Sequence, residues 1–286
     1  MKEQLIKNLY SEGACAVGVV RARKFDELRE ILEKRGRVSL CPTDIEQRIN
    51  PFYLMPEAKS IVVCLFSYFV KEECEISAYA VGKDYHTVVK NKLNAGAKII
   101  RDNGFLADAY VDNAPLPDRY LAYLAGLGFF GRNTMLINEK YGSMVFIGYI
   151  LTDCELLEDS PLENTYCMDC KKCISACPGG AIGENFDFNE DKCVSYLTQK
   201  KGELTKDEED IIKKSGYIWG CDICQRVCPY NYTPLTSQIP EFIHERIDKI
   251  DDLDDLSNKE FKKLYSERAF SWRGKAVLKR NMDLYK

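Results

Sequence analysis

The sequence lacks the features that mark membrane, secreted and repeat proteins. No apolar stretch approaches the length that spans a bilayer, and the first residues, MKEQLIKNLYSEG, include an acidic residue and no apolar signal-peptide core. There is no internal repeat or low-complexity segment. Positive charge is not in excess, since the net charge is −4 and the pI about 5.5. This balance argues against a protein that coats nucleic acid non-specifically, although a local basic patch remains compatible with it.

Cysteine, by contrast, is abundant: the chain holds 13. One run reads CxxCxxCxxxCP, in which three cysteines bind one iron–sulfur cluster and the fourth binds its neighbour. The second run, CxxCxxxCP, is one cysteine short, and Cys193 between the runs is the natural replacement. We therefore expect two four-thiolate [4Fe-4S] clusters. The predicted ligands are Cys167, Cys170, Cys173 and Cys228 for one cluster, and Cys177, Cys193, Cys221 and Cys224 for the other.

Structural zinc is the main alternative, because paired CxxC motifs also build zinc ribbons. Three cysteines at two-residue intervals and the CP dipeptides favour iron–sulfur clusters. A disulfide framework fits an odd number of cysteines in a long chain poorly. Free thiols without an export signal predict a cytoplasmic protein. The other cysteines are scattered, and Cys15 and Cys64 are expected to be small buried hydrophobes: Cys15, Cys41, Cys64, Cys74 and Cys154.

With 286 residues, 45% of them hydrophobic, the chain can form one large or two ordinary domains. Periodicity predicts helices over 4–11, 25–34, 85–102 and 117–125, and strands over 14–20, 60–67, 107–111 and 144–151. Capping boxes at Thr205 and Ser257 predict two further helices. The expected fold is an α/β (α+β) domain over 1–158, a ferredoxin-like double-cluster module over 159–236 and a helical basic tail over 237–286. Since a ferredoxin needs little more than its cluster module, the α/β domain should hold a second redox centre or a substrate.

Three motifs in the α/β domain are candidates for that role. Gly126, Gly128 and Gly131 spell GxGxxG, with Asp153 further on, but a helical pattern precedes them and a strand follows, which is the wrong context for a dinucleotide site. These glycines either let backbone approach a bulky ligand or simply turn the chain. The second motif, GKDYH, contains His86, which is a metal ligand, an acid–base group or a polar surface residue.

The third motif is VDNAPLPDR. Asp112 closes a predicted strand, where the sheet of an α/β domain conventionally presents its chemistry. A carboxyl there in a largely apolar pocket would have a raised pKa and act as a proton donor; the alternative is a turn residue bonded to its own backbone. Asp118, just inside a helix start, is explained by the helix dipole.

Eight segments of the chain can be considered together: GKDYH, VDNAPLPDR, GLGFFGRNTMLI, YGSMVFIGYILTD, CMDCKKCISACPGGAI, CVSYLTQKKGEL, GYIWGCDICQRVCPYN and SWRGK. In combination they resemble epoxyqueuosine reductase, a cobalamin-dependent family that completes queuosine in tRNA. The resemblance runs in order from about residue 59 to 275 and accounts for Cys193 as the eighth cluster ligand. It implies that electrons pass through both clusters to cobalamin held between the α/β domain and the cluster module. The epoxide of epoxyqueuosine at the wobble position is then reduced, with Asp112 as the general acid.

The resemblance also implies the remaining site residues. The cobalamin-facing positions are Gly82, Asp84, Tyr85, His86, Gly126, Gly128, Gly131 and Asn133. His86 lines the pocket rather than ligating cobalt, because Val89 replaces the glycine of the histidine-on signature. The partners are a tRNA anticodon stem-loop and an unidentified low-potential electron donor, and the chain is expected to be a monomer. Basic residues near the C-terminus are the candidates for tRNA contacts: Arg268, Arg273, Lys275, Lys279 and Arg280.

Two departures from the family pattern stand out: many members continue into helical repeats that grip tRNA, and the segment CPTDIEQRINPF is a loose match. The alternatives are a reductive dehalogenase-like enzyme, an electron-transfer protein without cobalamin, and a flavin or nicotinamide reductase. Retention of cobalamin and dependence on tRNA would distinguish them.

Overall fold

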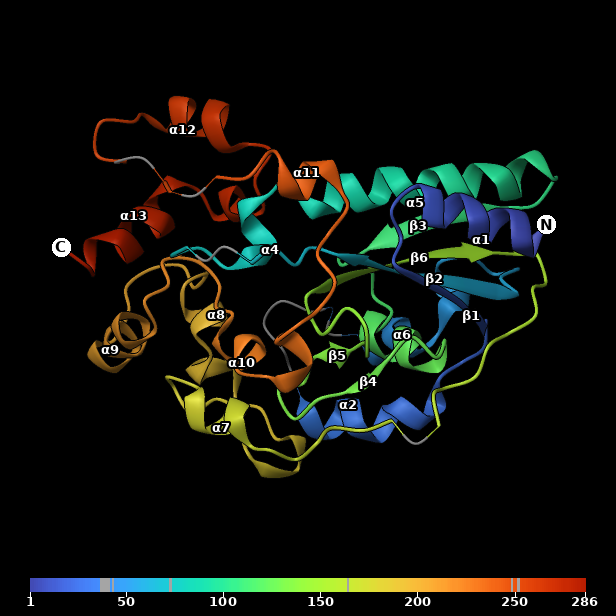
Figure 1. Cartoon of the computed structure of the whole chain (residues 1–286), viewed down its shortest axis with the longest axis horizontal. Helices are drawn as coiled ribbons and strands as arrows, with labels where there is room; N and C mark the ends of the chain where they lie inside the picture. Colours follow the sequence, from blue (N-terminus) through green and yellow to red (C-terminus); the bar gives the residue numbers. More distant parts are fainter. Residues whose placement is uncertain (37–41, 43, 72–73, 164, 248, 251–252) are drawn as a thin grey trace. The chain divides into compact units, whose positions relative to one another are not determined.

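The computed structural model describes residues 1–36, 42, 44–71, 74–163, 165–247, 249–250 and 253–286 (Figure 1). Cys41 and part of CPTDIEQRINPF lie outside them. The chain divides into two compact units, each built from three segments. The sheet unit comprises Met1–Ser67, His86–Phe129 and Val145–Tyr166, and the cysteine unit comprises Tyr68–Tyr85, Phe130–Met144 and Cys167–Lys286.

The sheet unit is built on a four-stranded sheet in the order β1-β2-β6-β3. Every neighbouring pair is antiparallel. The strands are β1 (Ala16–Arg21), β2 (Ser60–Ser67), β6 (Val145–Thr152) and β3 (Ala107–Val111). The sequence SIVVCLFS of β2 is buried along its whole length, as its β-branched and aromatic residues predict. Because the sheet is antiparallel, the rule that chemistry gathers at the carboxyl ends of parallel strands gives no reason for the position of Asp112.

Helices cover both faces of this sheet (Figure 1). On one face lie α1 (Lys2–Ser11) and α5 (Tyr85–Asp102), where Gly96 packs against Leu9 and Ile150. On the other face lies α6 (Asp118–Leu124), followed by Ala125, which approaches Gly18 of β1 too closely for any larger residue. The alternation of side chains along β6 turns Gly148 toward α5 and its neighbour Tyr149 toward the opposite face, that of α6.

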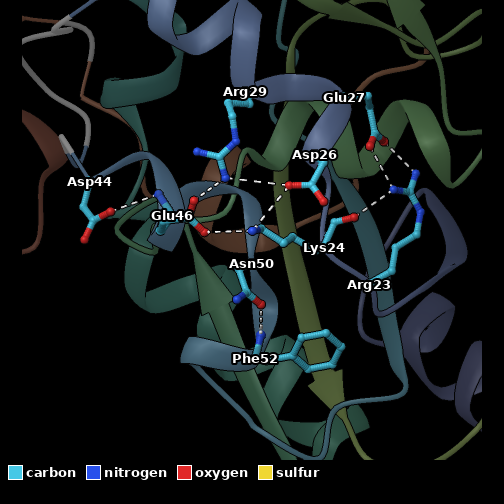
Figure 2. Close-up of polar contacts among 9 residues, drawn as sticks. All are labelled: Arg23, Lys24, Asp26, Glu27, Arg29, Asp44, Glu46, Asn50 and Phe52. Atoms are coloured by element: carbon cyan, nitrogen blue, oxygen red, sulfur yellow. Dashed lines mark hydrogen bonds and ion pairs between the residues drawn. The ribbon is translucent and has the colours of Figure 1, made fainter.

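A charged network joins the shorter helices of the sheet unit (Figure 2). These are η1 (Asp26–Leu28), α2 (Arg29–Arg35) and α3 (Ile45–Ile49), while η2 (Pro51–Tyr53) is capped separately by Asn50, which accepts from the Phe52 N–H at 3.1 Å. Glu46 of α3 pairs with both Lys24 (3.1 Å) and Arg29. Asp44 caps α3 by accepting from the Glu46 N–H at 2.9 Å. The helix predicted over 25–34 is thus split into a 3₁₀ turn and α2.

The cysteine unit consists of short elements around a core that includes Ile76, Trp219, Phe270 and Leu278. Only its later part contains longer helices, and the predicted capping boxes are both present, at Thr205 of α9 and Ser257 of α12. Its elements are α4 (Ala78–Val81), β5 (Leu136–Ile137), α7 (Lys172–Ala176), η3 (Glu184–Phe186), η4 (Glu190–Lys192), α8 (Val194–Leu197), α9 (Lys206–Ser215), α10 (Ile223–Arg226), η5 (Pro229–Asn231), α11 (Pro240–Ile243), α12 (Asn258–Tyr265), η6 (Ala269–Arg273) and α13 (Lys275–Asp283). The boundary between the units falls within β4 (Phe129–Phe130), which pairs with β5.

The predicted fold class is confirmed in its α+β form. The elements predicted over 60–67, 85–102 and 107–111 have the predicted ends, and apart from the divided helix the ends of the others differ by at most two residues. In the part of the chain that the structure describes, no helix combines the length and apolar character needed to cross a bilayer.

Candidate functional site

Asp112 occupies an unusual backbone position immediately after β3. Its φ of +54° lies in the left-handed region, which non-glycine residues seldom adopt. Its Oδ2 lies 3.2 Å from Nε2 of His86, near the start of α5, and both residues belong to the sheet unit. The Asp112 side chain is 55% exposed and that of His86 31%. The structure therefore brings together two residues that the sequence singled out separately.

Asp118, not Asp112, is the enclosed carboxyl of the VDNAPLPDR motif. It is the first residue of α6, at the helix start that the sequence predicts, but its surroundings disfavour the negative charge that the dipole explanation requires. Its Oδ1 is buried without a hydrogen-bond partner among the described residues. Burial raises the pKa of Asp118 well above its ordinary value, and the nearby Asp112 raises it further. The neutral carboxylic acid is thus the form that this environment favours.

One of the two predicted cluster ligand sets lines a single pocket in the cysteine unit. Cys173 lies in α7, while Cys228 comes from the turn before η5. Arg132 and Asn133 line the same pocket, and Arg132 donates to Asp169, which lies between two of the cysteines. The cysteines of this pocket are Cys167, Cys170, Cys173 and Cys228.

The other predicted ligand set also lies together. Cys177 and Cys193 both interact electrostatically with Cys221 and Cys224, and each raises the pKa of those thiols. Burial is the larger cause and raises the pKa of Cys221 to about 12. Because clusters bind thiolates, metal binding would have to release these protons. Within the described ranges, no three His, Cys, Asp or Glu side chains converge on the position of one metal ion.

A buried polar network supports the second cysteine run, and the sequence analysis missed it. Asn231 accepts from the Ser143 N–H at 2.8 Å and donates to the Ser143 hydroxyl at 2.8 Å. The Ser143 hydroxyl in turn donates to Gln225 at 2.9 Å. A Cβ at Gly142 would clash with Asn231. Hydrogen bonds therefore join the motifs YGS and CPYN. Because these motifs lie far apart in the sequence, their contact could not be predicted from either one.

Asp222, between two cysteines of the second run, is also fully buried. It accepts from the Ser77 hydroxyl and from the Ala78 N–H, the latter at 2.7 Å. These bonds fix the start of α4 to the cysteine run within the same unit.

The remaining cysteines match the description of small buried hydrophobes to different degrees. Cys64 is fully buried and Cys154 nearly so, while Cys15 and Cys74 are partly exposed. Burial nevertheless raises the pKa of the Cys15 thiol to about 12.

The predicted cobalamin-facing residues are divided between the units. His86, Gly126 and Gly128 belong to the sheet unit, and the others to the cysteine unit: Gly82, Asp84, Tyr85, Gly131 and Asn133. The GxGxxG segment follows α6 and precedes β5, which confirms that its context is wrong for a dinucleotide site. Gly126 has a local reason to be glycine, because its φ is +70° and a Cβ would clash with the Ser160 carbonyl. Asp153 accepts from the Leu106 N–H at 2.7 Å.

The basic residues near the C-terminus all make contacts inside the cysteine unit. Arg280 donates to the carbonyls of Lys200 and Gly202, both at 2.7 Å. Arg268 and Lys275 also donate to backbone carbonyls, and Lys279 pairs with acidic side chains. The guanidinium of Arg273 lies 3.7 Å from the centre of the Trp272 ring.

Comparison with known protein families identifies the class of protein to which the chain belongs. Residues 166–231 match a 4Fe-4S double cluster binding domain, so the cysteine unit makes this chain an iron–sulfur protein with two [4Fe-4S] clusters. Residues 48–113 match the model described as epoxyqueuosine reductase QueG, DUF1730. Epoxyqueuosine reductase of Bacillus subtilis (strain 168) is 34% identical over 99% of this chain and 78% of the relative. That of Leadbetterella byssophila is 35% identical over 88% and 85%. The chain belongs to the epoxyqueuosine reductase family.

Solved structures agree with this assignment. A crystal structure of epoxyqueuosine reductase with an epoxyqueuosine-modified tRNA stem loop has a TM-score of 0.89 and 33% identity, covering 99% of this chain and 80% of that chain. The Bacillus subtilis enzyme, solved with its catalytic aspartate loop swung out of the active site, has a TM-score of 0.87 and 32% identity over the same shares. The catabolic reductive dehalogenase NpRdhA, at 20% identity and a TM-score of 0.51, covers 82% of this chain and 32% of that chain and shows the fold alone.

Proposed function

We propose that this chain reduces epoxyqueuosine to queuosine at the wobble position of a tRNA anticodon. The observation that carries the proposal is the His86–Asp112 pair in a chain of this family: the bond of 3.2 Å places a proton beside a half-exposed carboxyl that substrate can reach. Deoxygenation of an epoxide to an alkene consumes two electrons and two protons and releases water. A positioned acid is therefore required as well as an electron source.

The grouping of the cysteines supports the two cluster ligand sets that were assigned from the sequence. One pocket gathers Cys167, Cys170, Cys173 and Cys228, and the other four cysteines interact with one another. Cobalamin bound to the chain would supply the electrons for reduction of the epoxide, and the two clusters would be the source from which it receives them. The candidate residues for holding it are the eight positions inferred from the family, of which His86 is engaged with Asp112.

The proton chemistry belongs to the sheet unit. His86 Nε2 and Asp112 Oδ2 share one proton, and Asp112 delivers it to the oxygen that leaves when the epoxide opens. His86 orients the Asp112 carboxyl and restores its proton afterwards. A second proton, needed to complete the loss of water, follows the same route.

The partners complete the proposal. The substrate is a tRNA anticodon stem-loop, the electrons come from a low-potential donor, and the protein works as a cytoplasmic monomer. The basic residues near the C-terminus remain the proposed tRNA contacts, although all five also have structural contacts.

The test is anaerobic reconstitution with iron, sulfide and cobalamin, followed by one turnover on an epoxyqueuosine-containing tRNA stem loop with the nucleoside identified by mass spectrometry. Queuosine is the expected product. Bound cofactors with an unchanged nucleoside would overturn the substrate assignment, and failure to retain cobalamin would point to an electron-transfer protein.

A further inference from the structure

The cysteine unit has a surface hollow beside one of the predicted cluster ligand sets, and the proposed chemistry gives it no task. This first set consists of Cys167, Cys170, Cys173 and Cys228. The residues that line the hollow come from α7 and the turn before it, from the end of α10 and from the segment after η5: Cys170, Lys172, Ser175, Ala176, Val227 and Tyr232. Within this unit α7 and α10 pack against each other (Figure 1). The hollow has a volume of about 450 Å³ and is open to solvent, so it has room for side chains of another molecule.

Cys170 is the point at which the predicted cluster ligands reach the surface. Among the eight predicted ligands, all of which the structure describes, it alone is exposed. Cys173 of the same set is buried, and the four ligands of the second set are only partly exposed. Because electron tunnelling slows steeply with distance, an electron from outside enters most readily at the exposed edge of the first cluster. The hollow therefore adjoins the natural entry point for electrons.

Lys172 places a positive charge in the hollow. Its ammonium donates to the Tyr232 hydroxyl at 2.8 Å and lies 5.1 Å from the centre of the Tyr232 ring. The Tyr232 hydroxyl in turn donates to the Val227 carbonyl at 3.3 Å, which fixes the ring at the hollow. No Asp or Glu is among the described residues that line the hollow. The charge of the ammonium is therefore presented without a carboxylate beside it.

The neighbouring cations of the first ligand set are already paired with acids. Lys171 pairs with Glu184 at 2.8 Å, and Arg132 pairs with Asp169. Lys172, by contrast, pairs with no carboxylate in the part of the chain that the structure describes. The whole chain carries a net charge of −4, so a second acidic protein is repelled by the chain at large and attracted at this point.

The rest of the hollow suits a brief contact with another protein. Ala176 and Val227 supply apolar surface, and Tyr232, which is 56% exposed, supplies an aromatic ring. Met168, two residues before Cys170, is 57% exposed. Aromatic residues and methionine are enriched in protein interfaces, and electron-transfer partners meet over small ones. An exposed redox ligand, a cation and a small apolar surface thus lie together.

We propose that this hollow is the docking site of the electron donor, and that the donor is a small acidic protein with a low-potential one-electron centre. A donor carboxylate pairs with Lys172, and an apolar donor side chain enters between Val227 and Tyr232. In each encounter the donor centre loses one electron and the first cluster gains it, and no bond is made or broken. Two encounters supply the two electrons that one epoxide consumes. The inference rests on the proposed function for the use of these electrons, while the docking itself is a property of the cysteine unit.

Stopped-flow reduction of the reconstituted holoenzyme tests the docking without tRNA. The probes are flavodoxin hydroquinone, an acidic one-electron donor, and reduced methyl viologen, and the loss of cluster absorbance is followed. Lys172→Glu should slow reduction by flavodoxin about tenfold at low ionic strength, and the difference should shrink as salt is added. Lys263→Glu reverses an exposed lysine of α12 outside the hollow and, as the matched control, should react like the wild type. Methyl viologen should reduce all three proteins without any slowing.

Three outcomes would overturn the proposal. An unchanged rate with flavodoxin in Lys172→Glu would refute the site. Equal slowing with both donors would show that Lys172 acts on the cluster itself. Failure of flavodoxin to reduce the wild type would refute the class of donor.

A second variant decides the matter if Lys172→Glu does not assemble the first cluster. Ser175→Tyr keeps the charge and fills the hollow, so it should slow reduction by flavodoxin and leave reduction by methyl viologen unchanged. Carbodiimide coupling joins a lysine amine to a carboxylate in contact with it and should link Lys172 of the wild type to flavodoxin, as mapped by mass spectrometry. Cross-links confined to other lysines would overturn the site.

The docking and the proposed function can fail separately. If the wild type forms no queuosine, the proposed function fails, and the rates of reduction by flavodoxin still decide the docking inference. If queuosine forms and flavodoxin reduces all the variants at the same rate, the proposed function stands and the docking inference fails.

Discussion

Two carboxylates in one short motif have opposite environments. Asp112 is half exposed and bonded to His86, while Asp118 is enclosed at the start of α6. Enzymes assign different tasks to neighbouring carboxyls in this way, because the environment sets which of them holds a proton. At the residue scale, substitutions at these two positions should therefore have different effects.

Asp112→Ala should retain both clusters and cobalamin and lose turnover. Removal of a general acid costs about 10²–10⁴-fold in rate. The measurement is single-turnover formation of queuosine, with cofactor content determined by absorption spectroscopy. Asp108→Asn, in the strand that precedes Asp112, is the control and should be fully active. A fully active Asp112→Ala would refute the acid assignment.

The stability of the protein should depend on pH through Asp118. Because its pKa is raised in the folded state, its contribution to stability is complete below the unfolded-state pKa and is lost as pH rises through the folded-state pKa. Asp118→Asn lacks this loss. The unfolding free energy of the wild type should thus fall relative to Asp118→Asn with increasing pH, by at most about 1.4 kcal/mol per unit. Urea titrations at several pH values measure the difference, and parallel curves would contradict it.

At the element scale, the cluster ligands are drawn from short helices and from the turns between them. Cys193 immediately precedes α8 and interacts with Cys221 and Cys224. It takes no part in lining the pocket of the other four cysteines. The two ligand sets are thus locally separate, although Cys228 of the first set follows all four cysteines of the second set along the chain.

Cys193→Ala should remove one cluster and leave the other. We expect the iron and sulfide content after reconstitution to fall by about half, with the remaining cluster visible by electron paramagnetic resonance after reduction. Cys74→Ala, a partly exposed cysteine of the same unit outside both sets, should retain the full content. Full iron content in Cys193→Ala would show that another residue is the eighth ligand.

The sequence predicted elements well wherever a local pattern determines them. The strand predicted from the β-branched and aromatic residues of β2 and the capping boxes of α9 and α12 appear in the structure as expected. What it did not predict depends on contacts between distant segments. The bond from Ser143 to Asn231 and the burial of Asp222 against Ser77 arise only when separate motifs meet. The enclosure of Asp118 likewise depends on packing of α6 on the sheet, while the spacing around it indicates only a helix start.

At the scale of the whole molecule, the C-terminal helix α13 belongs to the cysteine unit. Asn281 of α13 is fully buried and donates to the carbonyls of Thr198 and Ile218, both at 2.8 Å. Arg280 bonds to the chain around α8 in the same way. Basic residues in α13 therefore contribute to stability whether or not they contact tRNA.

Arg280→Ala should lower the unfolding free energy by about 2–4 kcal/mol, because carbonyls that now accept from a half-buried guanidinium would lose their donor. Lys279→Ala removes a more exposed cation paired with Asp254 and Asp283 and should lower the unfolding free energy much less, because water screens such surface ion pairs. Thermal and urea unfolding measure both. Equal effects would show that Arg280 has no special structural role.

The interleaving of the two units sets an order of events during synthesis. The last segment of the sheet unit ends at Tyr166, so every strand of its sheet has been synthesised before the first cluster cysteine is added. The segment containing Ile76 must instead wait for Trp219 and Phe270, its core partners. A nascent chain can thus complete the sheet unit, which contains His86 and Asp112, first. Iron is needed only once the cysteine unit has been made.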